Sequence, residues 1–246
     1  MQSGDIEVNP GPGSVDGSAD SSSNISLNSV EMLSNHLSIL HLNIQSIVPK
    51  MDLIKCEADA YDVLVFSESW LKPEVRDGSI IIDNFLPPFR ADRCDRPGGG
   101  VIIYVRDSFM CKRRSDLELQ GLEAVWIEIR VKSRNILIGG FYRPPNSNTG
   151  YFELINESID RAYNTSILDV IILGDFNFNM SLNNKNKMTE LLQDFDLKQL
   201  ITEPTHFTEN SSSLIDLIFV RNYSLVVSLI PLYRIKLDTT APSLYF

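Results

Sequence analysis

The segment with the clearest chemistry is Ile-Ile-Leu-Gly-Asp-Phe-Asn at residues 171–177. Its aliphatic residues predict a buried strand, which the glycine ends. Asp175 and Asn177 follow at positions i and i+2, which puts both side chains on one side of an extended backbone, at the strand's C-terminal end. Such a pair can hold an attacking water and a phosphate oxygen together, as hydrolysis of a phosphodiester requires. The alternative is an Asx-type turn after a core strand, where Asp and Asn are common.

Other polar residues also stand where apolar runs end, the positions at which a sheet presents functional groups. They are Asn43 after residues 38–42, Glu68 after residues 63–66, and Tyr142 after residues 136–141. Asp216 differs, because it lies inside the apolar run 214–219. A carboxylate there is costly unless it is paired, so we expect Asp216 to have a partner.

These residue types can share one reaction. Glu68, with help from Asn43, can hold Mg²⁺ through oxygen ligands. Asp175 can orient or deprotonate a water, and Asn177 and Tyr142 can donate to the charged phosphate. Each residue alone is more often structural than catalytic, but five at strand ends indicate a shared site.

The elements that must position these residues follow from the apolar periodicity. Strands are expected at residues 38–43, 63–66, 100–105, 125–131, 136–142, 170–173 and 214–220, and helices at 49–60, 151–163 and 187–195. Strands outnumber helices and several are consecutive, so the pattern predicts a two-layered β-sandwich flanked by helices rather than one parallel sheet.

Length and composition suit one domain that starts near residue 37. The chain has 246 residues, 43% of them apolar, and it contains neither an apolar run of membrane-spanning length nor a signal-peptide pattern. Its three cysteines are widely spaced and odd in number, which favours a reducing intracellular compartment over disulfides or a zinc site. We therefore expect no membrane association.

The net charge of −10 is unusual for a protein that binds nucleic acid, but the charge is unevenly distributed. Residues 1–36 hold five acidic and no basic residues, so half of the deficit lies there. This segment is rich in Ser, Asn, Gly and Asp and reads as a disordered leader. Arg90, Arg93 and Arg96 form a local basic cluster, and we expect Arg90 and Arg93 to contact nucleic acid.

In this order along the chain, the motifs resemble the endonuclease/exonuclease/phosphatase superfamily, and more narrowly the apurinic-type endonuclease domain of non-LTR (LINE-like) retrotransposons. The motifs are Leu-Asn-Ile-Gln-Ser at 42–46, Ser-Glu-Ser-Trp-Leu at 67–71, Arg93 with Gly-Gly-Gly-Val at 98–101, Tyr-Arg-Pro-Pro at 142–145, Gly-Asp-Phe-Asn at 174–177 and Ser-Leu-Ile-Asp-Leu-Ile at 213–218. The resemblance covers about residues 37–230. It implies an α+β, four-layer sandwich of two packed mixed β-sheets flanked by helices.

The resemblance also implies a function: Mg²⁺-dependent nicking of target DNA, with Mn²⁺ as an alternative ion. A reverse transcriptase domain would be encoded downstream, and the protein would act in the nucleus or cytoplasm. Carried over by position, Glu68 and Asn43 would bind the metal, and Tyr142 would contact the scissile phosphate. Asp175 and Asn177 would act on the nucleophile and the phosphate. Asp216 would orient a catalytic histidine.

The pattern breaks at the C-terminal end, where the family has an Asp-His pair. No histidine follows Asp216, and residues 237–243 read Leu-Asp-Thr-Thr-Ala-Pro-Ser where Leu-Asp-His-Cys-Pro is common. A two-base duplication would explain the change, which makes Asp238 the family aspartate and the residues after it out of frame. We therefore expect a crippled nuclease. The alternatives are a dead relic that still binds nucleic acid, and a phosphodiesterase of the same superfamily acting on small molecules or lipids.

The N-terminus carries an independent resemblance. Residues 4–12, Gly-Asp-Ile-Glu-Val-Asn-Pro-Gly-Pro, resemble the ribosome-skipping peptides of picornaviruses and several non-LTR retrotransposons. Together with the altered end, they suggest a fragment of a longer element, with a leader at 1–36 and the endonuclease-like domain at 37–246.

Overall fold

The computed structural model describes residues 36–181, 186–230 and 234–238. The peptide at residues 4–12, the rest of the leader before His36, and the tail from Thr239 onward lie outside the described residues. The described part belongs to one unit of the chain, residues 35–246.

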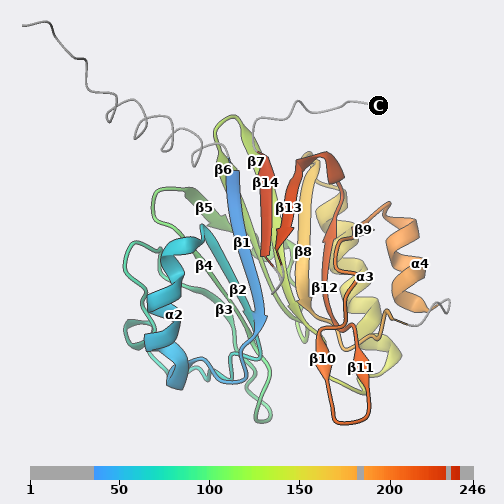
Figure 1. The fold of residues 1–246 in the computed structure, drawn as a ribbon, viewed down its shortest axis with the longest axis horizontal. Helices are drawn as coiled ribbons and strands as arrows, with labels where there is room; N and C mark the ends of the chain where they lie inside the picture. Colours follow the sequence, from blue (N-terminus) through green and yellow to red (C-terminus); the bar gives the residue numbers. More distant parts are fainter. Residues whose placement is uncertain (1–35, 182–185, 231–233, 239–246) are drawn as a thin grey trace, which may run out of the picture. The chain divides into compact units, whose positions relative to one another are not determined.

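Two six-stranded mixed sheets form the framework (Figure 1). The first has the order β13-β14-β1-β2-β4-β3, and its strands are β1 (His36–Asn43), β2 (Val63–Ser67), β3 (Phe89–Ala91), β4 (Val101–Val105), β13 (Val226–Ile230) and β14 (Arg234–Asp238). The second has the order β5-β6-β7-β8-β12-β9, and its strands are β5 (Met110–Arg113), β6 (Glu123–Val131), β7 (Arg134–Tyr142), β8 (Asp169–Asp175), β9 (Lys198–Gln199) and β12 (Asp216–Val220). A hairpin of β10 (His206–Phe207) and β11 (Ser212–Ser213) stands apart from both.

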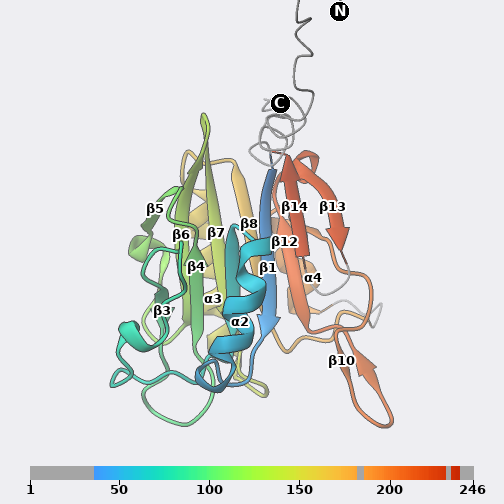
Figure 2. The same ribbon diagram turned by 60° about the vertical axis from the view of Figure 1, so that its left-hand side comes forward.

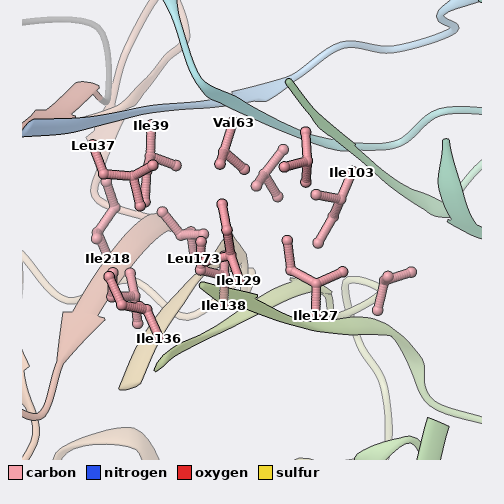
Figure 3. Close-up of a cluster of buried hydrophobic side chains, with 14 of the residues drawn as sticks. Leu37, Ile39, Val63, Ile103, Ile127, Ile129, Ile136, Ile138, Leu173 and Ile218 are labelled. Carbon is pink, nitrogen blue, oxygen red and sulfur yellow. The ribbon is translucent and has the colours of Figure 1, made fainter. Parts of the chain in front are cut away.

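The sheets pack face to face on a core of branched aliphatic side chains (Figure 3). Along β1, Leu37 and Ile39 point into this core, and along β8 Ile171 and Leu173 do the same. Because side chains alternate between the two faces of a strand, every second residue of the central strands is committed to the space between the sheets.

Helices cover the outer faces and complete four layers (Figures 1 and 2). The short helix α2 (Met51–Glu57) packs on the first sheet, and α3 (Thr149–Tyr163) and α4 (Lys187–Asp194) pack on the second. Helix α3 buries Phe152, Ile155, Ile159 and Ala162, whose spacing places them on one helical face. The predicted α+β sandwich of two mixed sheets is therefore confirmed.

Two features of the fold differ from the sequence-based expectation. Gly174 does not end its strand, since β8 continues to Asp175; at Gly174 a Cβ atom would lie 2.1 Å from the carbonyl oxygen of Phe141, so only glycine fits. Several short strands were also not anticipated, namely β3, β5, β9, β10, β11, β13 and β14. These have two to five residues each, too few for a recognisable alternation. Among the described residues, no helix is both long and apolar enough to cross a membrane.

Candidate active site

Four of the expected site residues lie at one edge of the sandwich because of strand register and alternation. Tyr142 pairs with Asp175 across parallel β7 and β8, and Asp216 pairs with Asp175 across antiparallel β8 and β12. Each side chain continues the series that points between the sheets: Tyr142 follows Ile138 by four residues and Asp175 follows Leu173 by two. The polar side chains at the ends of these core strands therefore lie at one inner edge of the sandwich. This is the lower edge in Figure 1, where the hairpin of β10 and β11 also lies.

Asn43 joins the two sheets at this edge. It ends β1, again in the inward series of Leu37 and Ile39, and its Nδ2 donates to Asp175 Oδ2 at 2.8 Å and to Glu68 Oε1 at 3.2 Å. One amide therefore links a carboxylate of the first sheet to a carboxylate of the second. The resulting cluster of Asn43, Glu68 and Asp175 is the centre of the site.

Glu68 reaches the cluster through an unusual loop. Its φ is +54°, as is that of Trp70, and both values lie in the left-handed region that non-glycine residues rarely adopt. The loop is held by its neighbours, since Ser69 N–H donates to the carbonyl of Gly100 at 3.2 Å and Trp70 N–H to that of Gly99 at 2.9 Å. The indole Nε1 of Trp70 then donates to Glu68 Oε2 at 3.1 Å. Backbone strain persists only where the surrounding structure maintains it, and residues strained in this way are concentrated at functional sites.

Tyr142 is buried beside Glu68. Burial, followed by the negative charge of Glu68 and a hydrogen bond with it, raises the pKa of the Tyr142 hydroxyl well above its usual value. The guanidinium carbon of Arg93 lies 5.4 Å from the centre of the Tyr142 ring. Tyr142 therefore stays protonated at neutral pH and remains able to donate a hydrogen bond.

Asp175 and Asn177 form the Asx-type turn, which is the alternative that the sequence left open. Asn177 N–H donates to Asp175 Oδ1 at 3.0 Å, as in an Asx-type turn, while Asp175 Oδ2 faces Asn43. Asn177 has a φ of +49°, so the backbone after Asp175 is not extended as the i, i+2 argument assumed. Burial raises the pKa of Asp175 to about 6, against the opposing effect of its hydrogen bonds from Asn43 and Asn177.

Arg143 holds the backbone of this turn through hydrogen bonds, a role that the sequence did not reveal. Its guanidinium is buried, donates to the carbonyls of Phe176 and Asn177 at 3.3 and 3.2 Å, and lies over the ring of Phe178. Asn177 Nδ2 in turn donates to the Arg143 carbonyl at 2.8 Å. The motif Tyr-Arg-Pro-Pro signalled this residue, but its contacts depend on residues more than thirty positions away.

Asp216 is the first residue of β12 rather than a mid-strand residue, and it is only 6% exposed. Its own N–H and that of Ile215 donate to Thr205 Oγ1 at 3.0 and 3.1 Å. Its side-chain Oδ1 is buried and has no hydrogen-bond partner among the described residues. Burial, and then the charge of Asp175, raises the pKa of Asp216 to about 7. The partner that the sequence argument expected is thus not supplied to this oxygen by the described residues.

This burial predicts an unusual dependence of stability on pH. The pKa of Asp216 is higher in the folded chain than its ordinary value of 3.8, so folding favours the protonated form. The stabilisation is complete below the unfolded pKa and is lost as pH rises from about 4 through about 7. Asp216→Asn removes the ionisation, so the variant should gain about 2–4 kcal/mol of unfolding free energy relative to the parent between pH 5 and pH 8. Urea unfolding at both pH values, in EDTA, measures this.

A matched control is Asp83→Asn, which removes a carboxylate at an exposed position. It should leave the pH dependence of the parent unchanged. Equal pH dependence of the parent and of Asp216→Asn would show that Asp216 is ionised in the folded chain at neutral pH.

The three histidines occupy different places. His36 begins β1, at the end opposite Asn43. His41 is fully buried, with Nε2 3.3 Å from Ser67 Oγ, and burial lowers its pKa to about 3, so it is neutral. His206 is exposed at the start of β10, in the hairpin that lies at the same edge of the sandwich as the site (Figure 1).

The donor set at the cluster fits a hard divalent cation. Asn43 Oδ1 is buried without a hydrogen-bond partner among the described residues, and it belongs to the same amide that contacts Glu68. No group of three or more His, Cys, Asp or Glu side chains is placed to hold a metal in the described part of the chain. If Glu68 supplied one carboxylate ligand and Asn43 one amide oxygen, the remaining coordination positions of the ion would be open to water and phosphate oxygens. Mg²⁺ favours this kind of ligation.

The remaining expected residues do not join the cluster. Arg90 uses its guanidinium nitrogens on Asp92, Asp77 and the carbonyls of Val75 and Lys72. Arg93 donates to Glu123 Oε1 at 2.9 and 2.6 Å, and its side chain is 8% exposed. Both arginines are therefore engaged with the protein itself.

Asp238 also lies apart from the cluster. It pairs with His36, seven residues along β1 from Asn43, so roughly 23 Å of strand separates it from the site. The structure thus does not bring Asp238 to the residues with which it was expected to act.

Comparison with known proteins shows which family the chain matches. A family model described as "Endonuclease/Exonuclease/phosphatase family" matches residues 35–238. A search of curated protein sequences found no match.

Solved structures share the fold at low sequence identity. The endonuclease domain of TRAS1, a telomere-specific non-LTR retrotransposon, is 16% identical with a TM-score of 0.64, over 82% of this chain and 98% of that one. The AP endonuclease LMAP from Leishmania major is 14% identical with a TM-score of 0.68, over 86% and 90% of the two chains. A 3′ phosphatase, NExo from Neisseria, bound to a product DNA hairpin, is 15% identical with a TM-score of 0.60, over 82% and 98%.

Proposed function

Because the chain belongs to the Endonuclease/Exonuclease/phosphatase family, we propose that it is a metal-dependent DNA endonuclease domain of the retrotransposon type. The observation that carries the proposal is the link from Glu68 through Asn43 to Asp175, which places a cation-binding carboxylate beside a carboxylate able to activate water. Support for DNA as the substrate comes from the neighbours named above, a retrotransposon endonuclease domain, an AP endonuclease and a phosphatase bound to DNA.

The residues divide the reaction among themselves. Above pH about 6, Asp175 is ionised and accepts a proton from the attacking water, while Asn43 fixes its orientation. Tyr142, kept protonated by burial, donates to a non-bridging phosphate oxygen. A Mg²⁺ ion bound by Glu68 and Asn43 would neutralise charge that develops on the phosphate.

Priming of reverse transcription requires a free 3′ hydroxyl. Water then attacks phosphorus and gives a proton to Asp175, while the bond to O3′ breaks and the departing oxygen takes a proton from solvent water. Asn177 lies directly after the Asp175 turn and retains a second amide hydrogen beyond the one given to Arg143. We propose that this hydrogen is donated to a phosphate oxygen during the step. A reverse transcriptase domain encoded downstream in the intact element would use the 3′ end.

A second candidate is a chain that binds DNA and cuts it slowly or not at all. The buried Oδ1 of Asp216 favours it, because this oxygen has no partner among the described residues where the family pattern has an Asp–His unit. Loss of one group that stabilises transition-state charge costs about 10²–10³-fold in rate. We therefore propose a rate reduced by that factor. The two-base shift after Asp238 is tested by the nucleotide sequence across residues 237–243.

The experiment that separates these functions is a panel of substrates with the same purified chain and Mg²⁺. A DNA endonuclease converts supercoiled plasmid to open circles with 3′ ends that a polymerase extends. A binding relic retains the plasmid without nicking it. Hydrolysis of phosphoinositides without any nicking would instead identify a lipid phosphodiesterase and contradict the proposal.

A further inference from the structure

Trp70 is an exposed aromatic residue held in place at the centre of the site. Its side chain is 48% exposed, although its indole nitrogen donates to Glu68 at 3.1 Å. Its backbone has a φ of +54°, which is rare for a bulky residue and requires external support. The carbonyl of Gly99 provides this support through the Trp70 N–H. Hydrogen bonds to neighbouring residues therefore maintain an unfavourable backbone conformation that keeps a large ring at the surface.

The other tryptophan shows the contrast. Trp126 is fully buried, donates to Ser158 Oγ at 2.9 Å, and packs edge-on against Phe141 with ring centroids 5.5 Å apart. Trp126 is thus a core residue whose polar atom is satisfied inside the protein. Trp70 satisfies its N–H on a carboxylate of the site and leaves its ring uncovered.

A polar cavity of about 330 Å³ opens next to the Trp70 loop. Its lining includes two positively charged residues, Lys72 and Arg96, and two negatively charged residues, Glu74 and Asp95. Lys72 and Arg96 are exposed, and neither has an ion-pair partner or a side-chain hydrogen bond among the described residues. Arg90 and Arg93, the cations expected to meet nucleic acid, form ion pairs within the protein, whereas Lys72 and Arg96 are exposed positive charges beside the Trp70 loop.

We propose that Trp70 is a stacking platform for the base of a nucleotide adjoining the scissile phosphate, and that Lys72 and Arg96 receive the next phosphate in the cavity. The proposal rests on the proposed function, because it assumes that a DNA strand occupies the cluster. An exposed indole face stacks on any base. Lys72 lies two residues after Trp70, and Arg96, from the segment before Gly98, lines the same cavity as Lys72. An aromatic face beside two cations matches a nucleotide, which has an apolar base and a charged phosphate. The hydrogen bond from Trp70 to Glu68 makes the same residue a positioning group for the cation-binding carboxylate.

Intrinsic fluorescence tests the stacking directly, because the chain has only two tryptophans and Trp126 is inaccessible. Titration with single-stranded and with duplex oligonucleotides in EDTA, where no cleavage occurs, should quench the emission of Trp70. The same titration of Trp70→Phe should leave the remaining emission of Trp126 unchanged. Anisotropy of labelled DNA, measured in parallel, reports binding independently of tryptophan.

The variants separate the ring from the charges. Trp70→Ala should weaken DNA binding by about 5- to 100-fold, with an unchanged salt dependence, and Trp70→Phe by no more than about threefold. The double variant Lys72→Gln/Arg96→Gln should lower the slope of log affinity against log salt by about 1–2. Tyr223→Ala and Lys55→Gln, at exposed positions of the second sheet's far end and of α2, are the matched controls and should bind as the parent does.

The outcomes distinguish this inference from the proposed function. If the parent nicks DNA but its emission is unaffected by bound DNA, or Trp70→Ala binds as tightly as the parent, the stacking role is overturned and the endonuclease stands. If Trp70 emission is quenched and Trp70→Ala loses affinity while no nicking occurs with Mg²⁺, the stacking role holds and the endonuclease fails. If the parent binds no DNA in anisotropy, both fail.

Discussion

Replacing Asp175 with asparagine is expected to lower the rate of DNA nicking by about 10²–10⁴-fold. The carboxylate is the group placed to take the proton of the attacking water, and an amide cannot do so. The change is nearly isosteric, and Asn177 N–H keeps an acceptor at Oδ1. The orientation of the side chain could still change, since an amide nitrogen facing Asn43 Nδ2 would remove the bond between them. Initial rates on supercoiled plasmid measure the effect.

A loss of activity at Asp175 must be separated from a loss of folding. Thermal unfolding of Asp175→Asn should stay close to the temperature of the parent, because removal of a buried ionisable group offsets loss of the hydrogen bond from Asn43. Asp83→Asn serves as the exposed control and should nick at the parental rate. Nicking by Asp175→Asn within a factor of three of the parent would remove Asp175 from the reaction.

Glu68→Gln is expected to reduce nicking by about 10³-fold and to remove most of the response to added Mg²⁺. Glu68 follows β2 and accepts a hydrogen bond from Asn43, and neutralising it removes the negative charge proposed to hold the cation. Charge stabilisation by a bound metal is worth several kcal/mol in the transition state, which corresponds to a loss of this size. Calorimetric titration with Mn²⁺, as a tighter-binding substitute, reports metal binding apart from catalysis.

The exposed Glu153 on α3 offers a control of the same chemistry, since Glu153→Gln should leave both metal affinity and nicking unchanged. In Glu68→Gln the two readouts should fall together. Retained Mn²⁺ affinity in that variant would show that the cation binds elsewhere, and the role assigned to Glu68 would be lost.

Much of the site could be predicted from sequence because its residues end strands that are long and apolar. The strands that end in Asn43 and Tyr142 were anticipated to their last residues, and the strand that ends in Asp175 was anticipated as far as Leu173. The convergence of these residues follows from register and from the alternation of side chains, which carry Asn43 and Asp175 to the same inner edge. The local sequence pattern predicts how side chains alternate within a strand. It does not predict which strands pair or how the two sheets pack on each other.

What sequence reasoning could not show about Arg90, Arg93 and Asp238 has a common physical origin in contacts between distant residues. Arg93 is engaged by Glu123, thirty residues later, and Arg90 by the loop that contains Asp77. Composition alone left both arginines available for phosphate. Asp238 is another case, because its distance from the site depends on the antiparallel pairing of β14 with β1, which no local motif reports.

Backbone conformation was equally hidden from the sequence. Glu68, Trp70 and Asn177 all have positive φ values although none is glycine. Their conformations are imposed by hydrogen bonds to the Gly98–Gly100 loop and to Asp175, not by their own preferences. The motif Ser-Glu-Ser-Trp-Leu therefore marked the position of the site but could not show that Trp70 is exposed there.

The central claim is that the cluster of Asn43, Glu68 and Asp175 hydrolyses DNA with a bound divalent cation. The most direct test is conversion of supercoiled plasmid by the purified chain at pH 8, with Mg²⁺ and with EDTA, beside Asp175→Asn. The account predicts slow nicking that requires Mg²⁺ and falls to background in the variant. Nicking that persists in EDTA, nicking that is equal in the variant, or no nicking by the parent at any Mg²⁺ concentration would contradict it.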